Sequence, residues 1–205
     1  MAKQVTRTLV GSIQNQQQVF GDLDALGFSG SKLWNVGRWT IDRIWQETGH
    51  IPGHSELTSY LKTHERYDDL HSQSSQRVLQ ELAEAFNGWY SKRQNGDYRA
   101  NPPGYRKHGS EHPRSTITFK NAGFKLDTTH DRVRLSKGET HKEYWSDFIL
   151  CKYQTRPDVD LSTVESVQQV RAVWTGTEWE LHFICKVEVQ VSESPGEKTV
   201  GVDLG

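Results

Sequence analysis

The chain has 205 residues, of which 34% are apolar and 10% are aromatic, enough to bury one large core or two small ones. This composition excludes a wholly disordered protein, and no apolar run approaches the ~20 residues of a membrane-spanning helix. The first residues lack the apolar core of a secretion signal, so we expect a cytoplasmic protein.

The net charge of -1 conceals an uneven distribution of charged residues. Residues 89–138 hold eleven basic and four acidic side chains, whereas residues 139–205 hold six basic and twelve acidic ones. The net charge argues against general attraction to nucleic acid. The basic middle segment nevertheless offers a local site for a polyanion.

The first part of the chain is predicted to be a strand followed by helices. Residues 4–10 alternate in polarity as a strand does, and Ser12 can cap a helix whose apolar spacing stops at Gly27. A loop is expected at 28–31. A second helix is expected from Ser31 to about residue 48, because its apolar residues share one face.

Two further helices are predicted before the spacing of apolar residues changes from helical to alternating. A short helix begins near Ser55, and the clearest helix of the chain spans about 72–92 with a continuous apolar stripe. Trp34, Trp45, Phe86 and Trp89 sit at helical spacing with other apolar residues and are assigned to the core. The segment 95–115 is rich in glycine, proline and basic residues and is predicted to be loop.

The rest of the chain alternates in polarity and is predicted to be a β-region. Short strands are expected at about 116–120, 123–127, 131–135 and 145–153. A longer pair forms a hairpin that turns near Thr175 and Gly176. Residues 191–197 resemble a linker and 198–205 a final strand. A strand parted from a β-region by helices indicates an α+β protein, a β-barrel or sandwich with a helical insertion.

Three motifs follow one another in a characteristic order. They are LVGSIQNQ at 9–16 with SKLWN at 31–35, LHSQSSQRVLQELAEAFNGWY at 70–90, and the hairpin end CKVEV followed by a linker and GVDLG at 201–205. Each motif is weak by itself, since GVDLG also occurs in unrelated ATPases and nucleases. Together they resemble the N-terminal half of the TnpB family, also called OrfB, of transposon-associated RNA-guided DNA endonucleases related to type V CRISPR effectors.

The resemblance implies an OB-like β-barrel called the wedge domain, a helical recognition domain inserted after its first strand, and the start of an RNase-H-like (RuvC) nuclease domain. The implied bounds are 1–10 for the first wedge strand, 11–100 for the helical domain, 101–192 for the wedge barrel, and 193–205 for the linker and first RuvC strand. The implied partners are a guide RNA from the transposon end and double-stranded target DNA, in a prokaryotic cytoplasm and on its nucleoid.

Asp203 lies in the final predicted strand, and by its local sequence it suits a turn as well as a metal site. The resemblance implies that it is a catalytic residue and the first Mg²⁺ ligand of the nuclease. Phosphodiester cleavage with two Mg²⁺ ions needs several carboxylates. The family's other acidic ligands and its zinc ribbon lie further downstream, so we expect no cleavage by these residues and no zinc site among them.

Two glutamines near the start of the 72–92 helix are candidates for DNA contact. Gln73 and Gln76 can each pair with adenine through two hydrogen bonds. Their alternative role is ordinary solvated surface. The resemblance implies that this helix reads the short motif that flanks the target.

The loop residues Tyr105, Arg106 and Lys107 combine an aromatic ring with two cations, which can stack on a base and neutralise phosphates. A solvated surface loop is the alternative interpretation. Neighbouring strands carry cations that are expected to continue the basic patch: Lys120, Lys125, Arg132 and Arg134.

Two classes of function follow. The chain is expected to be the nucleic-acid-binding half of a TnpB-like transposase, which binds guide RNA and target DNA with its flanking motif. The alternative is a non-catalytic relative that acts by occupancy, or a decayed transposase remnant. The basic segment fits both classes, so whether the parent protein is an enzyme stays open. The isolated Cys151 and Cys185 are expected to pack as small apolar residues.

Overall fold

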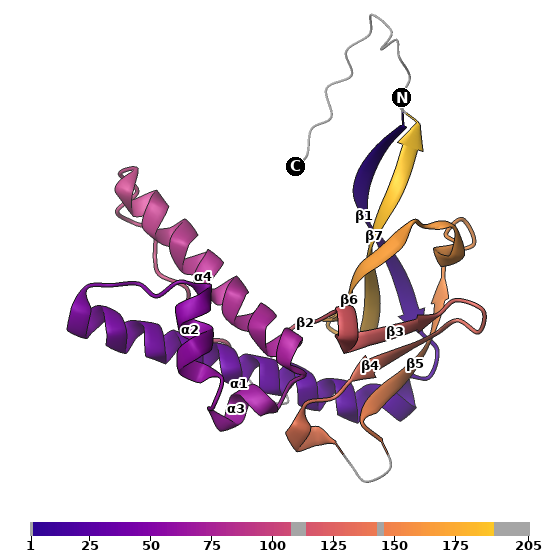
Figure 1. Ribbon diagram of the computed structural model, residues 1–205, viewed down its shortest axis with the longest axis horizontal. Helices are drawn as coiled ribbons and strands as arrows, with labels where there is room; N and C mark the ends of the chain where they lie inside the picture. Colours follow the sequence, from indigo (N-terminus) through magenta and orange to yellow (C-terminus); the bar gives the residue numbers. More distant parts are fainter. Residues whose placement is uncertain (1, 108–113, 143–145, 191–205) are drawn as a thin grey trace, which may run out of the picture.

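The computed structural model describes residues 2–107, 114–142 and 146–190 (Figure 1). The helices are α1 (Gln16–Thr48), α2 (His54–Leu61), α3 (Glu65–Asp68) and α4 (Ser72–Gln94). The strands are β1 (Ala2–Ile13), β2 (Ile117–Lys120), β3 (Phe124–Asp127), β4 (Arg132–Ser136), β5 (Phe148–Thr155), β6 (Ser166–Trp174) and β7 (Trp179–Gln190). Short 3-10 turns are η1 (Asn121–Gly123), η2 (Glu139–His141) and η3 (Leu161–Thr163).

The seven strands form one antiparallel sheet in the order β2-β6-β7-β1-β5-β4-β3. The two edge strands, β2 and β3, are consecutive in the chain and are joined by η1 alone. The sheet therefore curls into a nearly closed barrel. This confirms the α+β class and a barrel-like sheet, whereas the final predicted strand with Asp203 lies outside the described residues.

β1 occupies the middle of the sheet although it comes first in the chain. It pairs with β7 from Ala2 to Ser12 and with β5 from Gly11 to Ile13. All four α-helices lie between β1 and β2 in the sequence. A helical insertion thus separates the first barrel strand from the other six.

The structure corrects the prediction of two helices before residue 50. α1 is one helix of 33 residues, without a loop at 28–31. Its glycines mark close packing: a β-carbon would lie 3.0 Å from Trp179 at Gly27 and 2.7 Å from Ile117 at Gly30. The local preference of glycine for turns is therefore overridden by contact with the barrel.

The start of α1 also differs from the prediction. Ser12 belongs to β1, where it lies opposite Glu180, and it caps no helix. Asn15 precedes α1 and bonds to β5 instead, because its side chain contacts the Leu150 carbonyl at 2.9 Å and the Lys152 amide at 2.8 Å. Strand pairing thus extends β1 to Ile13.

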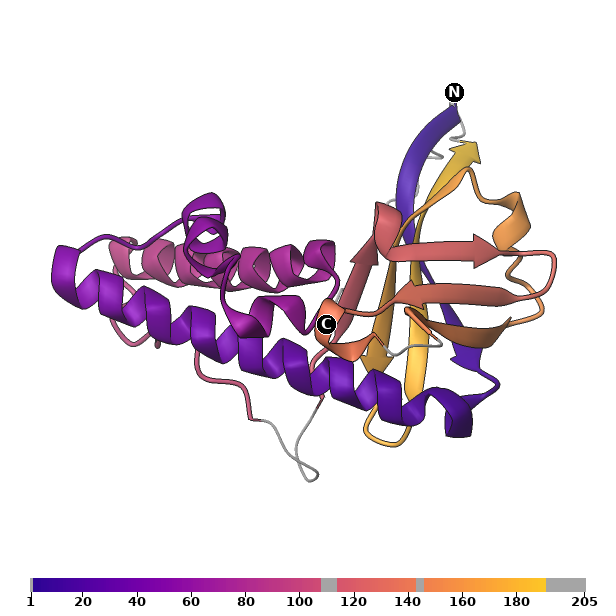
Figure 2. The same cartoon turned by 60° about the horizontal axis from the view of Figure 1, so that its bottom comes forward.

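α1 packs against the barrel with its first half and against the other helices with its second half (Figure 2). We call the packed contact between the helices and the barrel the junction. Lys137 is buried there, with its ammonium 3.1 Å from Asp22. Gly138 touches the chain before α4 so closely that a β-carbon would lie 2.3 Å from the Asp69 carbonyl carbon.

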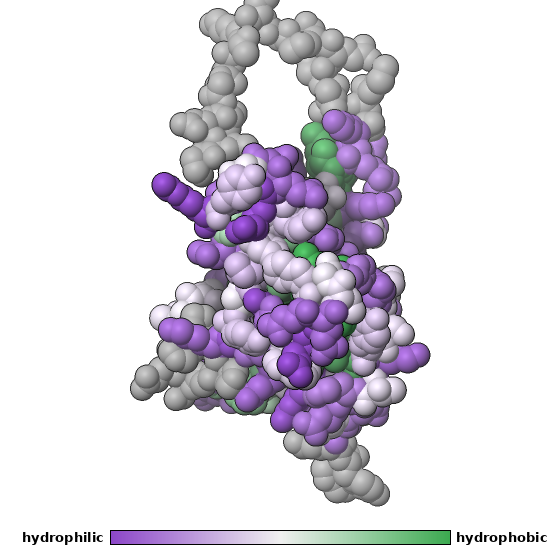
Figure 3. All heavy atoms as spheres, turned by 90° about the vertical axis from the view of Figure 1, so that its left-hand side faces the viewer, coloured by the Kyte–Doolittle hydropathy of each residue, from purple (hydrophilic) through white to green (hydrophobic). Residues whose placement is uncertain are grey.

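One hydrophobic core runs through both parts of the molecule. Leu79, Leu82 and Phe86 of α4 are buried, and Trp34 and Trp89 are nearly so, as predicted for core residues. Trp45 packs against this core at partial burial. The end of the helical part is covered mainly by hydrophilic side chains (Figure 3). None of the described helices is long and apolar enough to cross a membrane.

Candidate nucleic-acid interface

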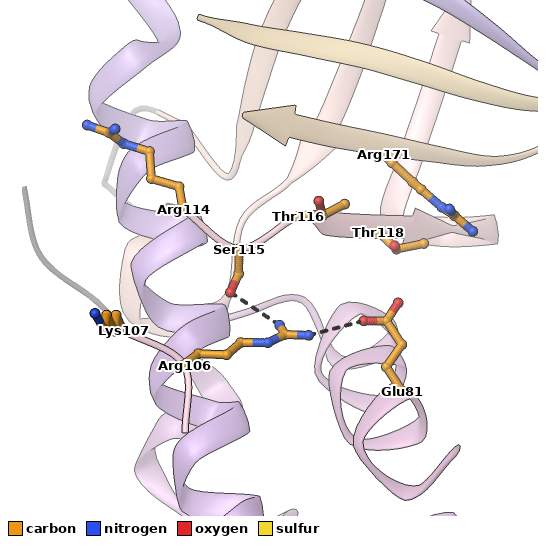
Figure 4. A pocket seen from close by; sticks show the side chains of 8 residues that line it. All are labelled: Glu81, Arg106, Lys107, Arg114, Ser115, Thr116, Thr118 and Arg171. Carbon is orange, nitrogen blue, oxygen red and sulfur yellow. Dashed lines mark hydrogen bonds and ion pairs between the residues drawn. The ribbon is translucent and has the colours of Figure 1, made fainter. Parts of the chain in front are cut away.

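An open cleft of about 580 Å³ lies between α4, the loop before β2, and strands β2 and β6 (Figure 4). Its lining is polar and mainly basic: Glu81, Arg106, Lys107, Arg114, Ser115, Thr116, Thr118 and Arg171. Cations outnumber carboxylates in this lining, so the cleft favours an anion. Its size suits a nucleotide-sized group.

Arg106 is held by the protein itself. Its guanidinium stacks 3.7 Å above the Trp34 ring, donates to Ser115 Oγ at 3.2 Å and lies 3.8 Å from Glu81 (Figure 4). Its backbone exchanges two hydrogen bonds with the Asn35 side chain. Burial lowers the pKa of Arg106, while Glu81 acts in the opposite direction. Arg106, a candidate for nucleic-acid contact in the sequence, therefore fastens the loop to α1, and its contact with nucleic acid stays a prediction.

The neighbours of Arg106 remain accessible. Tyr105 is 54% exposed, and its hydroxyl donates to Asp42 at 3.4 Å. The Arg38 guanidinium lies 5.4 Å from the centre of its ring. Lys107 is exposed at the mouth of the cleft. Tyr105 and Lys107 thus keep the surface that stacking and phosphate contact require.

Arg114 lines the cleft, but its side chain points away from the group around Arg106 (Figure 4). It forms an ion pair with Asp24 and stacks 4.2 Å from the centre of the Trp174 ring. Asp24 also accepts a hydrogen bond from the Trp179 indole at 2.9 Å. Arg114 therefore stabilises the junction.

Arg171 is the available cation of the cleft, and sequence reasoning missed it. It lies opposite Thr118 in the β2–β6 ladder. No carboxylate pairs with it in the part of the chain that the structure describes, and its Nε is buried there without a hydrogen-bond partner. Within the described residues, its guanidinium makes one hydrogen bond, a long contact of 3.5 Å from Nη2 to the Gln169 side-chain oxygen. A buried guanidinium nitrogen left unpaired is costly, and a bound anion removes that cost.

A signal for Arg171 was present in the sequence. Its neighbours Val170 and Ala172 are buried in the barrel, so alternation places Arg171 on the outer face. The acidic surplus of residues 139–205 obscured it, because charges were counted by segment.

The predicted glutamines have different surroundings on α4. Gln73 lies about two helical turns before Glu81 on α4 and is not among the residues that line the cleft. Gln73 Oε1 is buried without a hydrogen-bond partner among the described residues. Gln76 is exposed, and its interaction with Tyr67 partly opposes the effect of burial in raising the pKa of that phenol. Neither glutamine is among the residues that line the cleft, and their contact with DNA stays a prediction.

The cations predicted on the β-strands lie on two different parts of the barrel, one on β2 and the others on β3 and β4. Lys120 lies two residues beyond Thr118 on the same face of β2, but it is not among the residues that line the cleft. Lys125 lies opposite Arg134 across β3 and β4, and Arg132 lies opposite Lys152 across β4 and β5. We call the last four residues the outer basic face: Lys125, Arg132, Arg134 and Lys152.

The outer basic face has few internal partners. Arg132 lies 3.6 Å from Asp127, and Arg134 stacks 3.7 Å from the centre of the Phe148 ring. Lys125 and Lys152 form no ion pair with any described carboxylate. Like charges face one another across the strands, which costs stability unless an anion intervenes.

The metal predictions have no test in the described residues. Asp203 lies outside them, so its Mg²⁺ site stays a prediction. Residues 2–107, 114–142 and 146–190 contain no group of three or more His, Cys, Asp or Glu side chains placed to hold a metal ion. Burial raises the pKa of Cys151 to about 12 and that of Cys185 to about 11, so both thiols stay protonated and pack as apolar groups.

Comparison with known proteins identifies no family for this chain. No protein-family model matches the chain, and no curated protein matches it significantly. The function therefore has to be argued from the motifs and from the two basic surfaces.

Proposed function

We propose that the chain is the nucleic-acid-binding half of a TnpB-like RNA-guided DNA endonuclease. It binds guide RNA and target DNA, and reads a short motif beside the target, while sequence recognition is delegated to base pairing with the guide. Cleavage is not expected of these residues by themselves, because a two-metal nuclease needs more carboxylates than Asp203.

The observation that carries the proposal is the unpaired Arg171 in a polar cleft. A guanidinium with free donors binds phosphate through two hydrogen bonds, and the hydroxyl of Thr118 lies beside it (Figure 4). Lys107 adds a second cation to the lining of the cleft, and Tyr105, two residues earlier in the loop, adds an exposed ring. Phosphate and aromatic contacts of this kind are typical of nucleic-acid binding.

The architecture supports the same proposal. The insertion of helices after the first barrel strand agrees with the wedge and recognition domains that the motifs imply. The cleft lies between the helix that carries Gln73 and the barrel. The helix that carries the candidate base-reading residue thus also forms one wall of the cleft, through Glu81.

The proposal is tested by purifying the chain from cells that carry the transposon ends and sequencing the RNA that it retains. We expect one abundant RNA from a transposon end. Its affinity is then measured for Arg171→Gln and for Arg156→Gln, which removes the same charge from a side chain that is 78% exposed in a loop. We expect Arg171→Gln to weaken binding by about 1–3 kcal/mol and Arg156→Gln by less than ~0.5 kcal/mol.

Three results separate the alternatives. Random background RNA contradicts guide binding, whether by an enzyme half or by a protein that acts through occupancy. Equal losses in the two arginine variants contradict the cleft as the binding site. Cleavage of a matched target by the chain with Mg²⁺ and guide RNA contradicts the expectation that recognition is separated from catalysis.

A further inference from the structure

A second groove, of about 710 Å³, lies between α1 and α2, outside the basic cleft. Two aromatic side chains dominate its surface: Trp39 is 57% exposed and Tyr60 is 56% exposed. Leu61 and Ile44 supply apolar walls, and Lys32 and His64 also line the groove. Such exposure of large rings in a groove is unusual for a surface without a ligand.

The packing of the fold does not explain Trp39. In α1, Gly37 and Ile41 are buried, and a residue two positions from each lies on the opposite side of the helix. Trp34, on the same helix, packs in the core, and its indole donates a hydrogen bond to the Gly104 carbonyl at 3.0 Å. Trp39 therefore presents its ring to the groove and to solvent.

The charges around the rings complement a polyanion. The Arg43 guanidinium lies 5.5 Å from the centre of the Trp39 ring. Neither Arg43 nor Lys32 forms an ion pair with a carboxylate of the described chain, while Glu47 alone contributes negative charge to the lining. Cations beside open aromatic faces are the usual arrangement for binding a single strand, with bases stacked and phosphates neutralised.

A duplex fits this groove less well than a single strand, and a polypeptide partner is an outcome that the test below distinguishes. The bases of a duplex are already stacked on one another and offer no free face to Trp39. Asn35 is occupied by the backbone of Arg106, so little in the groove selects one base over another.

We propose that the α1–α2 groove binds single-stranded RNA by stacking unpaired bases on Trp39 and Tyr60, with Arg43 and Lys32 contacting the phosphates. This inference deepens the proposed function, because it names a second RNA contact apart from the Arg171 cleft. It does not depend on the RNA being a transposon guide.

The test measures binding of a labelled uridine oligonucleotide of about 12 residues and of a duplex of the same length, at fixed salt. Trp39→Leu is expected to weaken binding of the single strand about tenfold and to leave duplex binding unchanged. Trp39→Phe keeps a ring and is expected to retain most of the affinity. Tyr98→Leu is the matched control, since Tyr98 is 74% exposed outside the groove, and no change is expected.

Equal affinities for Trp39→Leu and Tyr98→Leu overturn the inference. So does a dimer or a stoichiometric protein partner that is lost with Trp39→Leu while oligonucleotide binding is kept. If no transposon RNA co-purifies but Trp39→Leu still selectively weakens the single strand, the proposed function fails and the groove assignment stands. If transposon RNA co-purifies and Trp39 is irrelevant to it and to the oligonucleotide, the groove assignment fails and the proposed function stands.

Discussion

The junction and the outer basic face both contain many charges, but they use them differently. At the junction, Arg106 is fixed by Trp34 and Glu81, and Lys137 by Asp22. On the outer basic face, cations oppose cations across the strands. Removing one partner of a charge pair within the protein destabilises the fold, whereas an unpaired charge on an open face is available to a binding partner.

Arg171 is the exception that makes this comparison useful. It lies at the edge of the junction but has no described carboxylate partner. In this respect it resembles the cations of the outer basic face. Changes at the junction should therefore affect the free energy of unfolding. Changes at Arg171 and on the outer basic face should affect binding.

The largest effect is expected from Gly138→Ala at the junction. A β-carbon there would lie within 2.4 Å of the backbone of Asp68 and Leu70, and backbone atoms cannot move aside cheaply. We expect a loss of about 3 kcal/mol in the free energy of unfolding, measured by urea denaturation. Gly21→Ala is the control, because nothing lies within 4 Å of its β-carbon position in α1, and it should stabilise by up to ~1 kcal/mol. Equal stabilities of the two variants would contradict the close junction.

The next effect is expected from Arg106→Ala, which removes the stack on Trp34 and leaves Glu81 with Arg77 as its ion-pair partner among the described residues. We expect a loss of about 2 kcal/mol in the free energy of unfolding. Arg106→Lys should recover less than half of this, since an ammonium cannot stack as a flat guanidinium does. Arg171→Gln in the same assay should change stability by less than ~0.5 kcal/mol. If Arg171→Gln is the more destabilising change, the roles assigned to the two arginines are reversed.

A smaller effect, on binding alone, is expected on the outer basic face. The double variant Lys125→Gln and Arg134→Gln removes two cations that face one another across β3 and β4. The slope of log affinity against log salt concentration should fall by about 1.4 to 1.8, depending on whether the ligand is single- or double-stranded. Stability should change by less than ~0.5 kcal/mol, because the lost stack on Phe148 offsets the relieved repulsion. An unchanged slope would exclude this face from the binding surface.

Elements with a strong local pattern were predictable from the sequence. The stripe of α4 and the hairpin of β6 and β7 are where periodicity places them, and the fold class follows from their order. The break predicted in α1 was wrong because Gly27 and Gly30 pack against Trp179 and Ile117, which lie far away in the chain. No local rule shows which distant ring will fill the space beside a glycine.

The site was less predictable, for a related reason. The count of basic and acidic residues in each segment identified a basic region. It could not show that Glu81 of α4 pairs with Arg106, or that Arg171 has no carboxylate partner among the described residues. Pairing is a property of the packed structure. Counting charges thus identifies a basic segment, but the packed structure decides which of its cations have a partner within the protein.

The smallest expected effect is a pH dependence that originates at the junction. His71 precedes α4, and burial lowers its pKa, with Lys142 acting in the same direction and Glu139 against it. Its Nδ1 is buried with no hydrogen-bond partner among the described residues. The unfolded chain therefore binds the proton more readily than the folded chain does. The contribution of neutral His71 to the free energy of unfolding should be fully present above the ordinary histidine pKa of about 6.5. It should be lost as the pH falls below that value and through the lower pKa of the folded state.

His71→Gln tests this dependence because glutamine cannot take up the proton. The urea midpoint is measured at about pH 7.5 and about pH 5.5 for both proteins, and the drop between them should be smaller in the variant. The two proteins differ at position 71 alone, so the difference between the two drops reports His71. An equal drop would mean that His71 is as solvated in the folded chain as in the unfolded one, and the junction would then be more open on this side than its packing at Gly138 and Lys137 indicates.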